Sequence, residues 1–308
     1  MAKSYSNNII QAMESETETD CLIQQAQALK EIVEEAGENL LQPDSVDQFS
    51  DKIFEFIKQS ENRIQENTKY EKENMTGEEE DQLDEEDLLV LKEENKNEQQ
   101  LQLDLGEIIG VLFKTHKAHC QNLAQKLINT VLPEVAKHES KQKQKFLLFI
   151  LDDMVEFLGP AFLGPVYPKI VEQICSYTSS KFAAIRQASV YGIGMVAQHG
   201  GDAFAALSDG CLLSLKTAIE FPMDGSVKEK KSKASQYHHA RDNAVAALGK
   251  VLQFQHGRAD HTALIPFWLN QLPLTHDMDE AKIQNKFVAE AVLRNPTAIL
   301  GDKYERLE

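Results

Sequence analysis

The sequence predicts an all-α fold in which antiparallel helix pairs stack into a superhelical array, an α-solenoid. Three observations favour this class. Apolar residues recur at helical spacing along most of the 308 residues, no convincing run of alternating apolar and polar residues lies between hairpin turns, and glycine and proline residues divide the chain into helix-sized segments. Helix pairs of this kind cannot bury their apolar faces alone, so we expect each pair to pack on the next.

The helices are expected in pairs along the whole chain. We expect the first helix of each pair near residues 17–36, 83–115, 141–158, 180–199, 233–255 and 278–293, and the second near 44–66, 117–136, 162–177, 202–219 and 262–271. The helix over 83–115 begins among acidic residues, which favour the positive end of the helix dipole. The helix over 141–158 has a wide apolar stripe, which indicates burial on more than one side. Glycine residues just after 180–199 and 233–255 are typical stop signals.

Two of these helices resemble each other, which predicts a repeat. IRQASVYGIG (185–194) and ARDNAVAALG (240–249) share an arginine at the second place and an aliphatic residue followed by glycine at the end. The same frame falls at positions 110, 152, 194 and 249, at intervals of 42, 42 and 55 residues. A period of 40–47 residues is that of HEAT and armadillo repeats. Gly110, Gly194 and Gly249 predict close approach between neighbouring helices.

Composition and charge exclude several classes of protein. With 42% hydrophobic residues the chain can bury a core, and its longest apolar run, Phe146–Leu151, is too short to cross a membrane. Four cysteines without a CxxC pair favour reduced thiols over a disulfide scaffold or a zinc site. No apolar signal segment is visible at the start. The net charge of −17 argues against a general nucleic-acid binder, so we expect a soluble, acidic, intracellular protein.

The negative charge is concentrated in one segment. Residues 71–98 hold thirteen acidic residues and three lysines. One interpretation of this acidic run is a solvated loop that leads into a helix. The functional alternative is that the run attracts a basic segment of a partner protein. We therefore expect three regions, namely HEAT helices over 1–70, an acidic insertion leading into a long helix over 71–100, and a single continuous solenoid over 101–308.

Patterns that resemble catalytic or ligand sites fit a structural role better. Gly192–Ala197 reads G-x-G-x-x-A, but it lies inside a helical pattern rather than between a strand and a helix, as a dinucleotide site requires. His116, His119 and Cys120 share one helix side but suggest no fourth metal ligand. The basic tract KEKKSK (228–233) is expected to be a loop. We find no catalytic signature, and we expect no enzyme activity, cofactor or metal.

Asp152 and Asp153 could be taken for a pair of catalytic carboxylates, but a structural role explains them better. Adjacent helical residues diverge by about 100°, so the two carboxylates cannot flank one bond. We expect them instead to form a structural ladder between repeats with Arg186 or Arg241.

Several segments resemble consecutive HEAT repeats of the importin-beta (karyopherin-beta) superfamily. They are KQKFLLFILDDMVEF, SSKFAAIRQASVYGIGMVAQHGGDAF, DNAVAALGKVLQF and LIPFWLNQLPLTHDMDEAK. The helix over 186–201 and the W-L-x-x-L-P-L motif at 268–274 are the most specific. The branch they resemble is the importin-five type of nuclear import receptor, and they match the carboxy-terminal part of a much longer chain.

The resemblance implies a nuclear transport receptor that binds proteins without catalysis. Its expected partners are protein cargo with basic localisation signals, Phe-Gly nucleoporins and Ran in its GTP form, although the amino-terminal repeats that supply the main Ran contact in the family are missing from the match. It implies shuttling between cytoplasm and nucleus, with no nucleic-acid or membrane partner. The alternative is a HEAT scaffold subunit of a phosphatase-regulatory or chromosome-associated complex. The candidate partner-binding residues are Glu78, Glu79, Glu80, Asp81, Asp84, Glu85, Glu86, Asp87 and, as an anchor, Trp268. For Trp268 a core position is the favoured alternative, because aromatic residues at helical spacing usually pack inward.

Overall fold

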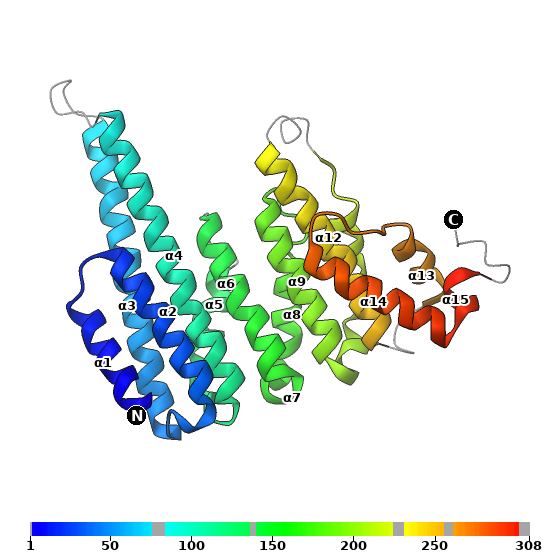
Figure 1. Cartoon of the computed structure of the whole chain (residues 1–308), viewed down its shortest axis with the longest axis horizontal. Coiled ribbons are helices and arrows are strands. Elements are labelled where there is room, and N and C mark those ends of the chain that lie inside the picture. Colours follow the sequence, from blue (N-terminus) through cyan, green and yellow to red (C-terminus); the bar gives the residue numbers. More distant parts are fainter. Residues whose placement is uncertain (1, 76–83, 136–139, 224–230, 256–260, 302–308) are drawn as a thin grey trace. The chain divides into compact units, whose positions relative to one another are not determined.

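Every regular element of the described chain is a helix. The structure is a computed structural model that describes residues 2–75, 84–135, 140–223, 231–255 and 261–301, and none of these residues lies in a strand. The chain divides into two compact units, Met1–Thr130 and Val131–Glu308, and each is described by itself. The predicted all-α class of stacked helix pairs is confirmed (Figure 1).

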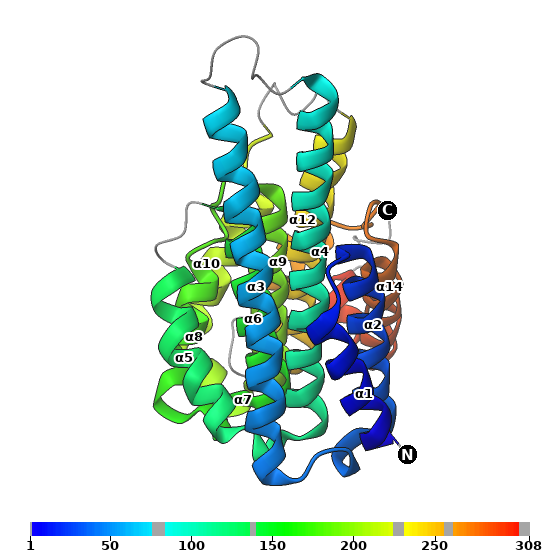
Figure 2. The same cartoon turned by 90° about the vertical axis from the view of Figure 1, so that its left-hand side faces the viewer.

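Unit 1 is built around one long helix. α4 (Glu85–Thr115) packs against α2 (Thr19–Ala36) and against α3 (Pro43–Met75), while α1 (Ala2–Ser15) covers α2 and α5 (Gln121–Val135) completes the last pair (Figures 1 and 2). The sequence explains this order, because α2 buries one face with residues three or four apart, namely Leu22, Ala26, Leu29 and Val33. α4 buries a wider face with Leu101, Leu105, Ile108, Ile109 and Leu112.

Polar contacts reveal the register of the helices in unit 1. Asn97 donates to Asp20 and Lys30 to Glu107, so α2 and α4 run parallel with an offset of 77 residues. α3 and α5 are likewise parallel, since Asn122 of α5 donates to Asp47 of α3 and Lys126 donates to Asp51 at the same offset of 75 residues. Parallel first helices and parallel second helices are what stacked pairs require. These offsets are larger than the 42-residue interval of the sequence repeat because α3 and α4 are longer than the helices of the other pairs.

Unit 2 continues the pattern with shorter helices. Its first-of-pair helices are α6 (Lys141–Asp153), α9 (Ala183–His199), α12 (Lys231–Phe254) and α14 (Met278–Arg294). The second-of-pair helices are α8 (Tyr167–Cys175), α10 (Ser208–Ile219) and α13 (His261–Leu269), and α15 (Pro296–Leu300) follows α14. α9 packs against α6 on one side and α12 on the other, and α12 also packs against α14. The predicted pairing of these segments is therefore confirmed.

Three elements differ from the prediction. α1 was not expected, and α3 continues to Met75, beyond the predicted end near residue 66. The helix predicted over 141–158 changes at Met154 into a π-helical turn that ends at Leu158, before the short helix α7 (Gly159–Leu163). Gly159 adopts a positive φ of 71°, which favours glycine, and it redirects the chain there.

Glycine residues allow close packing in unit 2, as predicted for Gly194 and Gly249. A Cβ atom on Gly249 would lie 1.9 Å from Gln284 Oε1 of α14, and one on Gly194 would lie 3.4 Å from the Cβ of Ala247 of α12. Gly192 makes a similar approach that the repeat comparison did not single out, since its Cβ would lie 2.0 Å from Asp152 Oδ1. A Cβ at position 192 or 249 would overlap a side chain of the neighbouring helix, and glycine leaves room for that side chain.

Candidate functional site: the acidic surface of unit 1

The two units differ completely in net charge. Residues 1–130 contain 29 acidic and 12 basic residues, a balance of −17, whereas residues 131–308 contain 20 of each. The whole net charge of the protein therefore resides in unit 1. A field of one sign attracts partners of the opposite sign and speeds their encounter.

Unit 1 presents part of this charge on a two-helix arm. The arm consists of the carboxy-terminal end of α3 (64–75) and the amino-terminal end of α4 (85–97), which extend together past the start of α2 (Figures 1 and 2). The two helices are antiparallel, because Asn67 of α3 donates to Glu94 of α4 while Gln102, further along α4, donates to the earlier Ser60. Leu89 and Val90 are 66% and 52% exposed on this arm, so it offers apolar as well as acidic side chains.

Four of the predicted acidic residues form the tip of α4 in the described structure. Asp84 caps the helix, since its Oδ1 accepts hydrogen bonds from the backbone N–H of Glu86 at 2.8 Å and of Asp87 at 2.9 Å. Glu85, Glu86 and Asp87 occupy the first turn and are exposed. Their charges are stabilised by the helix dipole while their carboxylates face solvent. The other four, Glu78, Glu79, Glu80 and Asp81, lie outside the described residues.

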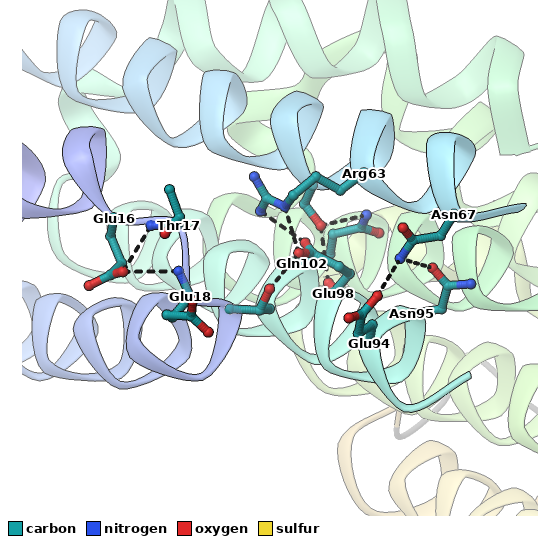
Figure 3. Close-up of polar contacts among 11 residues, drawn as sticks. Glu16, Thr17, Glu18, Arg63, Asn67, Glu94, Asn95, Glu98 and Gln102 are labelled. Carbon is teal, nitrogen blue, oxygen red and sulfur yellow. Dashed lines mark hydrogen bonds and ion pairs between the residues drawn. The ribbon is translucent and has the colours of Figure 1, made fainter. Parts of the chain in front are cut away.

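A buried carboxylate joins three helices at the base of the arm (Figure 3). Glu98 of α4 is only 2% exposed and accepts hydrogen bonds from Arg63 Nε at 2.6 Å and Arg63 Nη2 at 2.9 Å. Thr19 Oγ1 of α2 donates to the same carboxylate at 2.7 Å, and Ser60 Oγ of α3 donates to the backbone carbonyl of Glu98. This network ties α2, α3 and α4 together and holds the start of the arm in place.

The protonation state of Glu98 follows from this network. Burial by itself raises the pKa of the carboxyl, but the hydrogen bonds and the positive charge of Arg63 outweigh burial and lower the pKa below its usual value. Glu98 is therefore an anion at neutral pH. The sequence carried a signal for it, because Glu98 stands on the same apolar stripe of α4 as Leu101 and Leu105, and a charge on such a stripe requires a buried partner.

The predicted structural ladder of Asp152 with Arg186 or Arg241 is wrong. Both carboxylate oxygens of Asp152 are buried and have no hydrogen-bond partner among the described residues. Gly192 of α9 packs directly against this carboxylate, since a Cβ atom on it would lie 2.0 Å from Asp152 Oδ1. Burial, together with the charges of Asp153 and Glu156, raises the pKa of Asp152 well above its usual range. Asp152 is thus a neutral acid rather than a member of an ion pair.

The two arginines have other partners. Arg186 Nη1 donates to the backbone carbonyl of Ser180 at 2.7 Å, and its guanidinium lies 3.9 Å from the centre of the Phe221 ring. Arg241 Nη2 donates to Gln271 Oε1 at 2.6 Å. Both side chains therefore tie their helix to a neighbouring loop rather than to Asp152.

Contacts between repeats in unit 2 come from residues that the sequence did not single out. Asp242 Oδ2 accepts hydrogen bonds from three successive backbone N–H groups, those of Thr275, His276 and Asp277. Lys250 forms an ion pair with Glu280 at 3.0 Å, and both side chains are mostly buried. α12 and the start of α14 are thereby held in register.

Trp268 is a core residue and not a surface anchor. Its side chain is fully buried, and its ring centre lies 5.4 Å from that of Phe287 of α14. Trp268 also borders a largely apolar cavity of about 190 Å³, which α12, α14 and α15 complete. Partner binding by Trp268 is therefore contradicted, because α13 is packed with this residue facing inward.

The other candidate motifs have structural surroundings. Gly192–Ala197 lies in the middle of α9, as its helical pattern predicted. His116 Nε2 accepts a hydrogen bond from the backbone N–H of Leu41, and the buried Cys120 Sγ donates to the carbonyl of His116. Among the described residues, no group of three or more His, Cys, Asp or Glu side chains is placed to hold a metal ion. No helix in the described ranges is long and apolar enough to span a membrane.

Comparison with known proteins connects this fold to one family. The family described as Importin repeat 6 matches residues 21–135. A probable importin-5 homolog of Dictyostelium discoideum is 26% identical over 280 residues, which are 88% of this chain and 24% of that protein. Importin subunit beta-3 of Saccharomyces cerevisiae is 24% identical over 211 residues, 66% of this chain and 18% of that protein. The chain thus spans about a quarter or less of the length of these curated relatives.

Solved structures show the same fold. The crystal structure of Kap121p bound to Pho4p matches 98% of this chain and 26% of the Kap121p chain, with a TM-score of 0.65 and 18% identity. Kap121p bound to Nup53p matches the same share of this chain with a TM-score of 0.66 and 18% identity. The importin repeat over 21–135, the relatives along most of the chain and the shared helical-repeat fold agree. Residues 21–135 therefore match an importin repeat, and most of the chain is similar to an importin-5 homolog and to importin subunit beta-3.

Proposed function

We propose that this chain is part of an importin-five-type nuclear import receptor and that its acidic unit 1 attracts the basic segments of protein cargo. It acts by binding and performs no catalysis. The similarity to an importin-5 homolog and to importin subunit beta-3 supports this proposal. Kap121p, which has the same fold, has been crystallised with Pho4p, with the SUMO protease Ulp1p and with Nup53p.

The uneven charge carries the proposal. Unit 1 has 29 acidic and 12 basic residues, so 17 acidic residues remain even if every basic residue is paired with one. The exposed residues Glu85, Glu86 and Asp87 lie at one end of the arm. Charges at the rim of an interface mainly accelerate association and select partners of opposite sign. A lysine- and arginine-rich localisation signal has the matching charge. The proposal extends to Glu78, Glu79, Glu80 and Asp81.

The finer roles belong to the same proposal. We include binding of Phe-Gly nucleoporins, release of cargo by Ran in its GTP form, and shuttling between cytoplasm and nucleus. A stack in which each pair contacts only its neighbours can change its curvature with little strain, which suits a receptor for varied cargo.

The test compares two matched sets of charge removals. One variant carries Glu85→Gln, Glu86→Gln and Asp87→Asn in unit 1, and the control carries Glu172→Gln, Asp209→Asn and Glu220→Gln, which remove three exposed acids from unit 2. Association with a fluorescent lysine- and arginine-rich peptide is followed by stopped flow at low and at physiological salt. We expect the unit 1 variant to slow association about three- to tenfold at low salt, and less at physiological salt.

The control should leave the association rate nearly unchanged. Equal effects of the two variants, or no effect of either, would contradict a role of this acidic surface. A Phe-Gly peptide resin tests the nucleoporin contact separately. Capture of a stable phosphatase catalytic subunit instead of nucleoporins would favour the scaffold alternative.

A further inference from the structure

Two thiols of unit 2 face each other across consecutive helix pairs. Cys175 is the last residue of α8 and Cys211 lies in the first turn of α10, and their sulfur atoms are 4.0 Å apart. Both helices are the second of their pair, and they pack against each other. All four cysteines of the chain are reduced, yet the other two, Cys21 and Cys120, have no such neighbour among the described residues.

The two sulfurs differ in the way that disulfide chemistry requires. Cys211 is 1% exposed, whereas Cys175 is half-buried and can be reached from solvent. Hydrogen bonds from Cys211 and from Ser214 lower the pKa of Cys175 despite its burial, and the same contact raises the pKa of Cys211. We assign Cys175 as the attacking sulfur because it is the less buried of the two, and Cys211 as the buried sulfur beside it.

We propose that Cys175 and Cys211 are a reversible redox pair, in which a peroxide oxidises Cys175 and Cys211 then closes a disulfide between α8 and α10. This inference does not depend on cargo binding. The two sulfurs must approach from 4.0 Å to about 2 Å, the length of an S–S bond. The end of α8 and the first turn of α10 are the places where the helices adjust at least cost, because terminal turns are held by fewer backbone hydrogen bonds.

The chemistry balances with hydrogen peroxide as the oxidant. The Cys175 thiolate attacks one peroxide oxygen, the O–O bond breaks, hydroxide leaves and a sulfenic acid forms. The Cys211 sulfur then attacks the sulfenic sulfur, the S–S bond forms, and the S–O bond breaks. The hydroxyl group leaves as water with the proton of Cys211. The two sulfurs together lose two electrons. The hydroxide takes up the proton that Cys175 released on forming its thiolate, so one peroxide becomes two water molecules.

The bridge would add a covalent link between successive repeats that are otherwise joined by packing and hydrogen bonds, such as that from Ser189 Oγ to the Ile174 carbonyl. It closes a loop of 36 residues that contains all of α9. Because stacked repeats contact only their neighbours, one covalent tie between two pairs limits bending at that point. Oxidation would thereby stiffen unit 2 without altering unit 1.

The experiment uses the full chain with Cys21→Ser, which removes the exposed thiol and prevents links between molecules. The protein is treated with dilute hydrogen peroxide, alkylated, and mapped by mass spectrometry without reduction. We expect a linked peptide pair containing Cys175 and Cys211, lighter by two hydrogen atoms than the two reduced peptides and restored by dithiothreitol. The melting temperature of the oxidised protein should rise by about 5 °C or more.

Two single variants serve as controls. In Cys211→Ala, dimedone should trap the sulfenic acid on Cys175, and peroxide should no longer raise the melting temperature. In Cys175→Ser, which changes a half-buried residue and preserves folding, Cys211 should remain reduced. The proposal is overturned if peroxide leaves Cys175 reduced, if the sulfenic acid persists while Cys211 is present, or if the bridge forms without raising the melting temperature.

Discussion

Units 1 and 2 are built from the same helix pairs but join successive pairs by different means. In unit 1, polar and charged side chains connect α2 to α4 at regular offsets, as in Lys30–Glu107 and Asn97–Asp20. In unit 2, glycine at 192 and 249 lets helices approach until a single Cβ atom would collide. The difference teaches that a strongly acidic unit and a unit without net charge can share one architecture, with polar bridges in both and close approach at two glycine positions in unit 2.

The largest expected effect comes from breaking the buried network of unit 1. Arg63→Ala leaves the Glu98 carboxylate buried without its cation, and we expect a loss of about 3 kcal/mol in the free energy of unfolding. We take the lower end of the usual range because a third of the Arg63 side chain is exposed. Urea unfolding followed by circular dichroism measures the loss. A change below 1 kcal/mol would show that unit 1 does not depend on this network.

The close approach in unit 2 is tested by adding one methyl group. Gly192→Ala places a Cβ 2.0 Å from Asp152 Oδ1, and we expect a loss of about 2 kcal/mol in the free energy of unfolding. Gly210→Ala in α10 is the matched control, because nothing lies within 4 Å of its Cβ. The control should be neutral or stabilise by up to about 1 kcal/mol through better helix propensity. If both changes act alike, close packing is not what distinguishes unit 2.

The two buried carboxyls should respond to pH in opposite directions. The pKa of Glu98 is lowered in the folded state, so its contribution to stability is present above its unfolded value of 4.5 and is lost as the pH falls through the folded pKa. The pKa of Asp152 is raised, so the folded state binds its proton more tightly, and stability declines as the pH rises above the unfolded value of 3.8 toward the folded pKa.

Variants that replace each carboxyl group with an amide of the same shape test the two pH dependences separately. Asp152→Asn should stabilise the protein relative to the wild type by an amount that grows between pH 4 and pH 8. Glu98→Gln should destabilise it at neutral pH, with a difference that shrinks below pH 4.5. Urea titrations at several pH values measure both trends. Parallel trends for the two variants would refute the assigned protonation states.

The smallest effect is expected from a single surface bridge. Lys30→Gln removes an ion pair whose side chains are 29% and 56% exposed, and we expect a loss of about 0.5 kcal/mol. The comparison variant Lys250→Gln breaks a pair with 10% and 14% exposed side chains and should cost about 1.5 kcal/mol. Thermal melting of both variants side by side ranks them. The reverse order would contradict the view that unit 1 distributes its connections over many weak bridges.

Much of the fold could be predicted because its signal is local. The stripe of α6 and the terminal glycine after α9 are both readable within one helical segment, and the helix pairs follow from them. The candidate site was only partly predictable. The cap at Asp84 and the first turn of α4 follow from local pattern, whereas the Arg63–Glu98 pair joins residues 35 positions apart and has no local spacing.

The failed predictions share a cause. Asp152 was assigned an arginine partner because acids and arginines recur at similar places in the repeats, but the distance across a seam depends on Gly192 of the neighbouring helix. Trp268 could have faced either way on a helix that is apolar nearly all round, and only the packing of α14 shows that it faces Phe287.

The amino-acid sequence by itself determined the helical class, the pairing of helices, the excess of acid in the first 130 residues and the family resemblance. These properties depend on periodicity, composition and motifs within short stretches. The tertiary structure alone decided that Glu98 is a paired anion, that Asp152 is a neutral acid, and that Cys175 and Cys211 face each other. Charge state and reactivity depend on what lies within a few ångströms, and in stacked helices those neighbours come from distant parts of the chain.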